Sequence, residues 1–94
     1  MPCLVRWGIK VVKTLGSARH RSLIATLIAK REDAGLTQTE LAAALGEYQS
    51  FVARLESGQR RIDVIELIKL SELLNFDAPS VVQAVQKVEE DDEI

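Results

Sequence analysis

Apolar residues recur at helical spacing along most of the chain, and the first segment with this pattern covers residues 17–34. Ser17 can cap the start of a helix here, and Gly35 can end it. The stripe at positions i, i+3, i+4 and i+7 consists of Ile24, Leu27, Ile28 and Arg31. Because a charged group on a buried stripe needs compensation, we expect an anionic partner for Arg31.

Two short helices joined by a tight turn come next. Thr37 and Glu40 have the spacing of a capping box and mark the start of the first helix. The second helix is predicted at 49–57, with Val52 and Leu55 as its inward pair. Its other side carries small or hydrogen-bonding groups, the composition that a helix needs to approach base edges. These groups are Gln49, Ser50, Ala53 and Arg54.

The remaining apolar pattern predicts a core helix and a last helix, so that the whole fold is all-α with five helices. A second capping box, Asp63 with Glu66, precedes the core helix at 64–74. Pro79 suits the first turn of the last helix, at 79–88. This helix carries more apolar surface than one small core can cover, so we expect it to form a homodimer contact. Its valines are Val81, Val82, Val85 and Val88.

The amino-terminal arm has a different pattern. From Val5 to Val11, apolar residues alternate with charged or small ones, which is the period of a half-buried strand. Because a single strand needs a partner, one interpretation is a ribbon between residues 3–12 of two subunits. The other is an extension without regular structure, or one added by a wrongly assigned translation start. The predicted organisation is an arm at 1–16, a helical domain at 17–88 and an acidic tail at 89–94.

Composition limits the core and the partners of the chain. Aromatic residues make up 4% of the 94 residues, so the core must consist of Leu, Ile, Val and Ala. The formal net charge of −2 is unevenly distributed: residues 1–31 hold seven Lys or Arg and no acid, whereas residues 89–94 hold five acids. Without that tail the charge is +3, so the overall value does not exclude a DNA-binding protein.

Few residues are available for chemistry. Cys3 is the only cysteine, which excludes an internal disulfide and a cysteine-based zinc site. His20 is the only histidine, and between Arg19 and Arg21 we interpret it as a solvated side chain, with a phosphate contact as the alternative. Without a catalytic constellation, we predict that the protein is not an enzyme and uses no cofactor or metal. No segment has the pattern of a signal peptide or a membrane span, so we expect a cytoplasmic protein without a membrane partner.

A joint pattern extends over residues 20–86. It consists of Arg31, Gly35, Leu36, Thr37, Gln38, Glu40, Leu41, Ala42, Leu45, Gly46, Val52, Leu55, Glu56, Gly58, Arg60 and Arg61. This pattern resembles the phage-repressor and Cro type of helix-turn-helix domain, known as the XRE family. The resemblance implies a lambda-repressor-like bundle of five helices that binds double-stranded DNA.

The resemblance also implies roles for individual residues. Arg31 and Glu56 match a buried salt bridge between the first helix and the recognition helix, which supplies the missing anionic partner. Tyr48 departs from the family, where this position carries a short polar cap; either the helix starts differently or the Tyr48 hydroxyl lies near a phosphate. Base-reading positions are matched by Gln49, Ser50 and Arg54. DNA-backbone positions are matched by Gln38, which also braces the recognition helix, and by Tyr48, Gln59, Arg60 and Arg61.

The function implied by these observations is sequence-specific transcriptional regulation. A homodimer acting as a repressor would place one recognition helix, 49–57, in the major groove of each half-site. Phe51 either touches a thymine methyl or covers the edge of the core, and we favour the second interpretation. Two alternatives stay open: an antitoxin that binds a toxin partner and represses its own operon, or a protein-interaction module that has the same fold but does not bind DNA.

Overall fold

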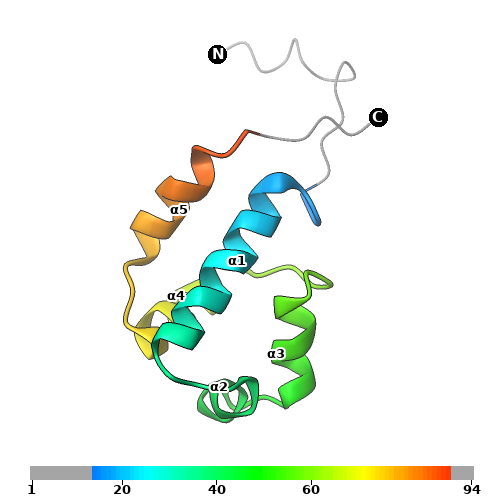
Figure 1. The fold of residues 1–94 in the computed structure, drawn as a ribbon, viewed down its shortest axis with the longest axis vertical. Coiled ribbons are helices and arrows are strands. Elements are labelled where there is room, and N and C mark those ends of the chain that lie inside the picture. Colours follow the sequence, from blue (N-terminus) through cyan, green and yellow to red (C-terminus); the bar gives the residue numbers. More distant parts are fainter. Residues whose placement is uncertain (1–13, 90–94) are drawn as a thin grey trace.

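The structure is a computed structural model that describes residues 14–89. Within this range the chain forms five helices and no strand, which confirms the predicted all-α fold (Figure 1). None of these helices is long and apolar enough to span a membrane. The predicted arm strand at 3–12 and residues 90–94 of the acidic tail lie outside the described residues. The helices are α1 (Ala18–Asp33), α2 (Gln38–Leu45), α3 (Gln49–Glu56), α4 (Val64–Leu74) and α5 (Ala78–Gln86).

Capping residues set the starts of the first, second and fourth helices, as the sequence predicts. The Ser17 hydroxyl accepts a hydrogen bond from a backbone N–H in the first turn of α1, at 3.2 Å. Both capping boxes are complete, because Thr37 and Glu40 accept hydrogen bonds from each other's backbone and so do Asp63 and Glu66. Each cap satisfies N–H groups that the first turn of a helix leaves without a partner.

The last helix differs at both ends from the predicted range 79–88. The Asp77 carboxylate accepts a backbone N–H at 3.1 Å, so α5 begins one residue earlier. At the other end, the Arg19 guanidinium of α1 donates to the carbonyl oxygens of Gln86, at 3.0 Å, and of Val88, at 2.9 Å. These bonds stabilise the carboxyl end of α5, which stops at Gln86, and hold it against α1.

The turn between α2 and α3 depends on Gly46. Its φ of 75° lies in the left-handed region that favours glycine, and its N–H donates to carbonyls in the last turn of α2. Tyr48 is the N-cap residue of α3, but its side chain makes no capping hydrogen bond. The extended backbone of Tyr48 still provides the geometry of an N-cap, so α3 begins at Gln49 as predicted.

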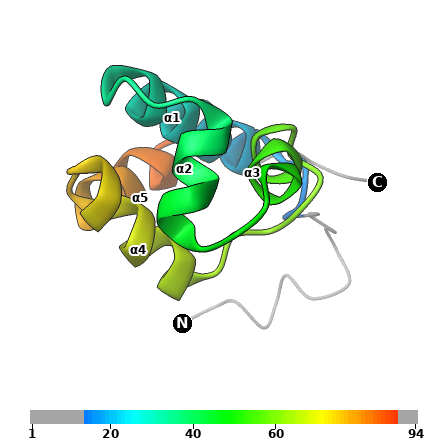
Figure 2. The ribbon, with the colours of Figure 1, turned by 90° about the horizontal axis from the view of Figure 1, so that it is seen from below.

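One apolar core fills the space between the first four helices. α1 packs against α3 and α5 (Figure 1), and Figure 2 shows α2 lying between α3 and α4 at one end of the bundle. Val52 of α3 is fully buried. This arrangement leaves the opposite side of α3 uncovered by the other described helices. The buried cluster consists of Ile24, Leu27, Leu41, Ala42, Val52, Leu55, Leu67, Leu70 and Leu74.

Some large apolar side chains remain on the surface. On α5, Val81 is buried against α1, whereas Val82 is 44% exposed. On α4, Val64 and Ile65 are 69% and 73% exposed. The exposed side chain of Val82 is an apolar surface that a second subunit could cover, and the homodimer contact of the last helix stays a prediction.

A paired substitution on α4 tests the position of the core. Leu70→Ala, at a site that is 2% exposed, is expected to lower the free energy of unfolding by about 2–5 kcal/mol because it leaves a cavity. Ile65→Ala on the same helix, at a site that is 73% exposed, is expected to change it by less than about 0.5 kcal/mol. Urea denaturation followed by circular dichroism measures both. Equal effects would contradict the described burial.

Candidate nucleic-acid interface

The outward face of α3 presents the three side chains that the sequence predicts to read bases. Gln49, Ser50 and Arg54 are all exposed, whereas Val52 and Leu55 on the inward side are buried. Ser50 and Arg54 are four residues apart and therefore lie on one side of the helix. The face offers an amide, a hydroxyl and a guanidinium, which are groups that form hydrogen bonds with base edges in the major groove.

An ion pair fixes the carboxyl end of α3 against α1. Arg31 Nε donates to Glu56 Oε2 at 2.7 Å, and Arg31 Nη2 donates to Glu56 Oε1 at 3.1 Å. The two side chains are only 12% and 6% exposed. Arg31 Nη1 also donates to the carbonyl of Leu36, at 2.7 Å. The hydrogen bonds to Glu56 raise the pKa of Arg31 above its ordinary value.

Gln38 connects this ion pair to the reading face. Its Nε2 donates to Glu56 Oε1 at 2.9 Å, and its Oε1 accepts a hydrogen bond from Gln49 Nε2 at 2.8 Å. A chain of hydrogen bonds therefore runs from the largely buried side chain of Arg31 to exposed Gln49. The bond between Gln38 and Gln49 therefore holds the first turn of α2 to the first turn of α3.

The loop after α3 holds three of the residues that the sequence predicts to contact the DNA backbone, and their environments in the structure differ from one another. Gln59 and Arg61 are exposed, and Arg61 donates to the hydroxyl of Thr14. Arg60 instead forms two hydrogen bonds of 3.0 Å with the carboxylate of Glu66. The loop therefore combines exposed polar groups with one guanidinium that already has an anionic partner.

Two aromatic residues lie at the start of α3: Tyr48 is its N-cap residue and Phe51 is in its first turn. Tyr48 is 84% exposed, so its hydroxyl is accessible from outside the turn. Phe51 is partly buried against the core cluster, and the Arg60 guanidinium lies 4.4 Å from the centre of its ring. Phe51 thus covers the edge of the core, the interpretation that we favour from the sequence.

His20 differs from the expectation of a solvated side chain. It is partly buried, and its Nδ1 accepts a hydrogen bond from the Gly16 N–H at 3.0 Å. Its Nε2 is buried and has no hydrogen-bond partner within residues 14–89. The chain turns at Gly16, and the bond from this turn holds the partly buried imidazole in place. The arginines on either side of His20 in the sequence do not indicate this contact.

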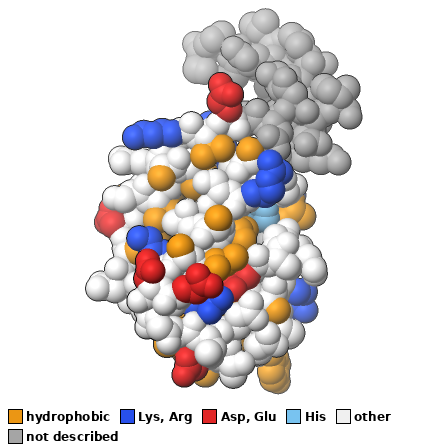
Figure 3. Space-filling model, viewed as in Figure 1, with side chains coloured by type: hydrophobic (Ala, Val, Ile, Leu, Met, Phe, Trp, Pro, Cys, Tyr) orange, Lys and Arg blue, Asp and Glu red, His pale blue; other side chains and the backbone are white. Residues whose placement is uncertain are grey.

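Charges on the surface are mixed rather than separated. On the face of the described residues shown in Figure 3, basic and acidic side chains are interspersed, so attraction to an anionic partner depends on individual cations. Across residues 14–89, no group of three or more His, Cys, Asp or Glu side chains is arranged to hold a metal ion. The arrangement suits recognition by hydrogen bonds and single charges.

The comparisons with known proteins agree with this geometry. A family model described as "Helix-turn-helix" matches residues 27–79. An XRE-family like protein from Pseudomonas syringae pv. tomato str. DC3000 shares 39% sequence identity, with a TM-score of 0.68, over 73% of this chain and 84% of its own. The clp gene regulator ClgR from Corynebacterium glutamicum shares 25% identity, with a TM-score of 0.64, over 72% of this chain and 88% of its own in one of its structures. None of the curated proteins matches the chain.

Removing one partner of the buried ion pair is expected to destabilise the fold strongly. Glu56→Ala leaves the Arg31 charge buried without compensation, which should lower the free energy of unfolding by about 3–5 kcal/mol. The double variant Arg31→Met with Glu56→Leu serves as the control, because it removes both charges and should recover much of the loss. Urea denaturation measures all three proteins. A near-neutral Glu56→Ala variant would show that the pair does not hold α3.

Proposed function

The chain belongs to the XRE family of helix-turn-helix proteins, and on this premise we propose that it is a sequence-specific DNA-binding transcriptional regulator that acts as a repressor. The observation that carries the proposal is the exposed face of α3, whose Gln49 is joined through Gln38 to the Arg31–Glu56 ion pair. Because this contact restricts the Gln49 side chain before DNA binds, little of its conformational freedom is lost on binding. Similarity to the clp gene regulator ClgR supports a regulatory role.

The exposed face of α3 reads bases in the major groove. Arg54 donates two hydrogen bonds to O6 and N7 of a guanine, the commonest specific contact of this kind. Gln49 recognises an adenine through its amide, and Ser50 bonds to a neighbouring base edge. Each side chain is exposed on α3, as such contacts require.

Backbone contacts surround this face. Gln38 at the start of α2, Tyr48 before α3, and Gln59 and Arg61 after it bind phosphate or sugar oxygens. Arg61 is exposed, and its described partner is the neutral hydroxyl of Thr14, which does not compensate the charge of an arginine. Such contacts fix the position of α3 on the duplex without reading its sequence.

A homodimer completes the mechanism. Two subunits that associate through α5 would present two α3 helices to half-sites one DNA turn apart, about 34 Å. Occupation of both half-sites then excludes competing proteins from a promoter. The partly exposed valines at the end of the chain, Val82 foremost, supply the apolar contact.

Substitutions at Arg54 and Arg61 separate base reading from phosphate binding. Sites bound by the parent are first selected from random DNA, and binding is then measured over a range of salt concentrations. Arg54→Ala is expected to cost about 1–3 kcal/mol of binding and to relax preference at one position per half-site. Arg61→Ala should weaken binding to all sequences and reduce the slope of log K against log salt by about 0.9. If both variants bind like the parent, the assigned faces are wrong.

The dimer contact is tested by a neighbouring pair on α5. Val82→Glu places a charge on the exposed apolar surface of α5 and is expected to convert a dimer into monomers. Gln83→Glu adds the same charge at an adjacent exposed position and should have little effect on the dimer. Sedimentation velocity measures the mass of each protein. A parent that sediments as a monomer at micromolar concentration would contradict the homodimer.

A further inference from the structure

Arg60 is a cation whose charge is compensated inside the protein. Its Nη1 and Nη2 groups each donate to one oxygen of the Glu66 carboxylate, at 3.0 Å, and its guanidinium stacks 4.4 Å from the centre of the Phe51 ring. A two-pronged carboxylate contact and a stacked ring together fix the plane of the guanidinium. The hydrogen bonds with Glu66 raise the pKa of Arg60 above its ordinary value.

Glu66 has a second task in the same place. Its Oε1 also accepts the backbone N–H of Asp63, at 3.1 Å, and so completes the capping box of α4. Phe51, whose ring contacts the guanidinium, belongs to α3. Arg60 therefore fastens the loop between α3 and α4 to both helices, through the side chain that also fixes the start of α4.

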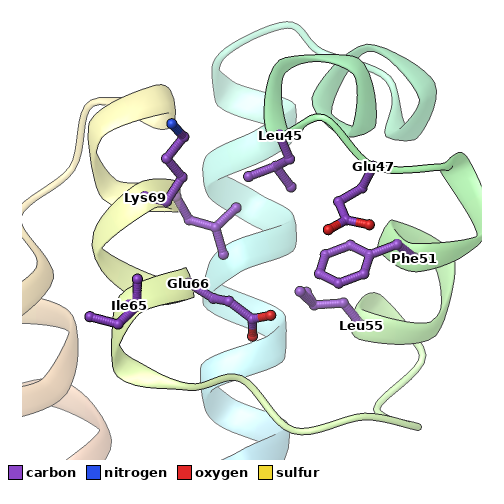
Figure 4. A pocket seen from close by; sticks show the side chains of 8 residues that line it. Leu45, Glu47, Phe51, Leu55, Ile65, Glu66 and Lys69 are labelled. Atoms are coloured by element: carbon purple, nitrogen blue, oxygen red, sulfur yellow. The ribbon is translucent and has the colours of Figure 1, made fainter.

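The surroundings of Arg60 are unfavourable for a phosphate. Figure 4 shows Glu47, Phe51 and Glu66 pointing into the hollow between α3 and α4, and the charge of Glu47 also raises the pKa of Arg60. Glu66 occupies two of the five N–H groups of Arg60, and a phosphate that approached the others would be repelled by the carboxylates of Glu66 and Glu47. The neighbouring Arg61 is exposed, and its described partner is a neutral hydroxyl.

We propose that Arg60 is a positioning residue for DNA binding rather than a phosphate contact: it fixes the loop so that Gln59 and Arg61 meet the DNA backbone. This rests on the proposed function, because loop position matters for binding only if the loop meets DNA. The proposal assigns Arg60 a role different from the one that the family resemblance implies, and it leaves Arg61 as the loop's phosphate-binding cation.

We call the contacts of Arg60 with Glu66 and Phe51 the clamp, and its effect on the loop is tested without DNA. Arg60→Gln removes the guanidinium, so amide hydrogen exchange at Gln59 is expected to become faster by about tenfold while exchange in the core of α1 stays unchanged. Lys69→Gln is the matched control, because Lys69 lines the same hollow but lies outside the clamp. Unchanged exchange at Gln59 in the Arg60 variant would overturn the proposal.

The positioning role is tested with DNA selected by the parent protein. Arg60→Gln is expected to weaken binding about tenfold while the slope of log K against log salt stays as in the parent. Arg60→Lys keeps the charge but not the two-pronged contact, so it should behave like Arg60→Gln. A phosphate contact predicts the opposite pattern: Arg60→Gln would reduce the slope by about 0.9 and Arg60→Lys would retain most of the binding. That pattern would overturn the proposal.

In the Glu66→Gln variant, the direction of the change in DNA affinity distinguishes a positioning role of Arg60 from a phosphate contact. Glutamine keeps the capping acceptor but weakens the clamp, so DNA binding should fall about tenfold, as for Arg60→Gln. If Arg60 instead binds phosphate, its release from Glu66 would tighten binding and overturn the proposal. Glu47→Gln controls for the loss of a nearby carboxylate. A parent without salt-dependent DNA binding would refute the proposed function and the positioning role together, whereas unchanged hydrogen exchange refutes the positioning role only.

Discussion

The ion pair between Arg31 and Glu56 is the constraint on which the arrangement of the other elements depends. α3 has eight residues, a length at which an isolated helix is not stable in water. Its last residue is Glu56, and the pair holds that end against α1 while Gln38 holds the other end against α2. Because the two charged side chains are largely buried, the orientation of α3 and the stability of the fold depend on the same contact.

Five of the six arginines in residues 14–89 divide into two groups, and this division explains why net charge is a poor guide to the partners of the chain. Arg19 ends α5, Arg31 holds α3, and Arg60 is paired with Glu66. Arg54 and Arg61 are exposed on or beside the outward face of α3. A count of charges treats all five alike, whereas the partner of each guanidinium decides whether it is available to a phosphate or a base.

Local signals were enough to predict the helices, but not all of the site. Ser17, Thr37 and Asp63 mark helix starts because a cap and its first turn are neighbours in sequence. The pairing of Arg31 with Glu56 joins residues far apart in sequence, and only the family resemblance indicated it. Glu66 was already explained as a cap, so its contact with Arg60 across a loop had no separate signal. The burial of His20 depends on the turn at Gly16, which no periodicity reports.

The hydrogen bond between Gln38 and Gln49 has a consequence for the entropy of recognition. A free glutamine samples many rotamers, and restricting one at an interface costs about 0.5–1.5 kcal/mol. Folding of the chain already restricts the Gln49 side chain, so this entropy is not lost again when DNA binds. An amide has two N–H donors and one carbonyl oxygen, and the bond to Gln38 uses a single donor. Gln49 can therefore keep this bond and still offer an adenine the remaining N–H and the oxygen, so that recognition adds contacts without dismantling any.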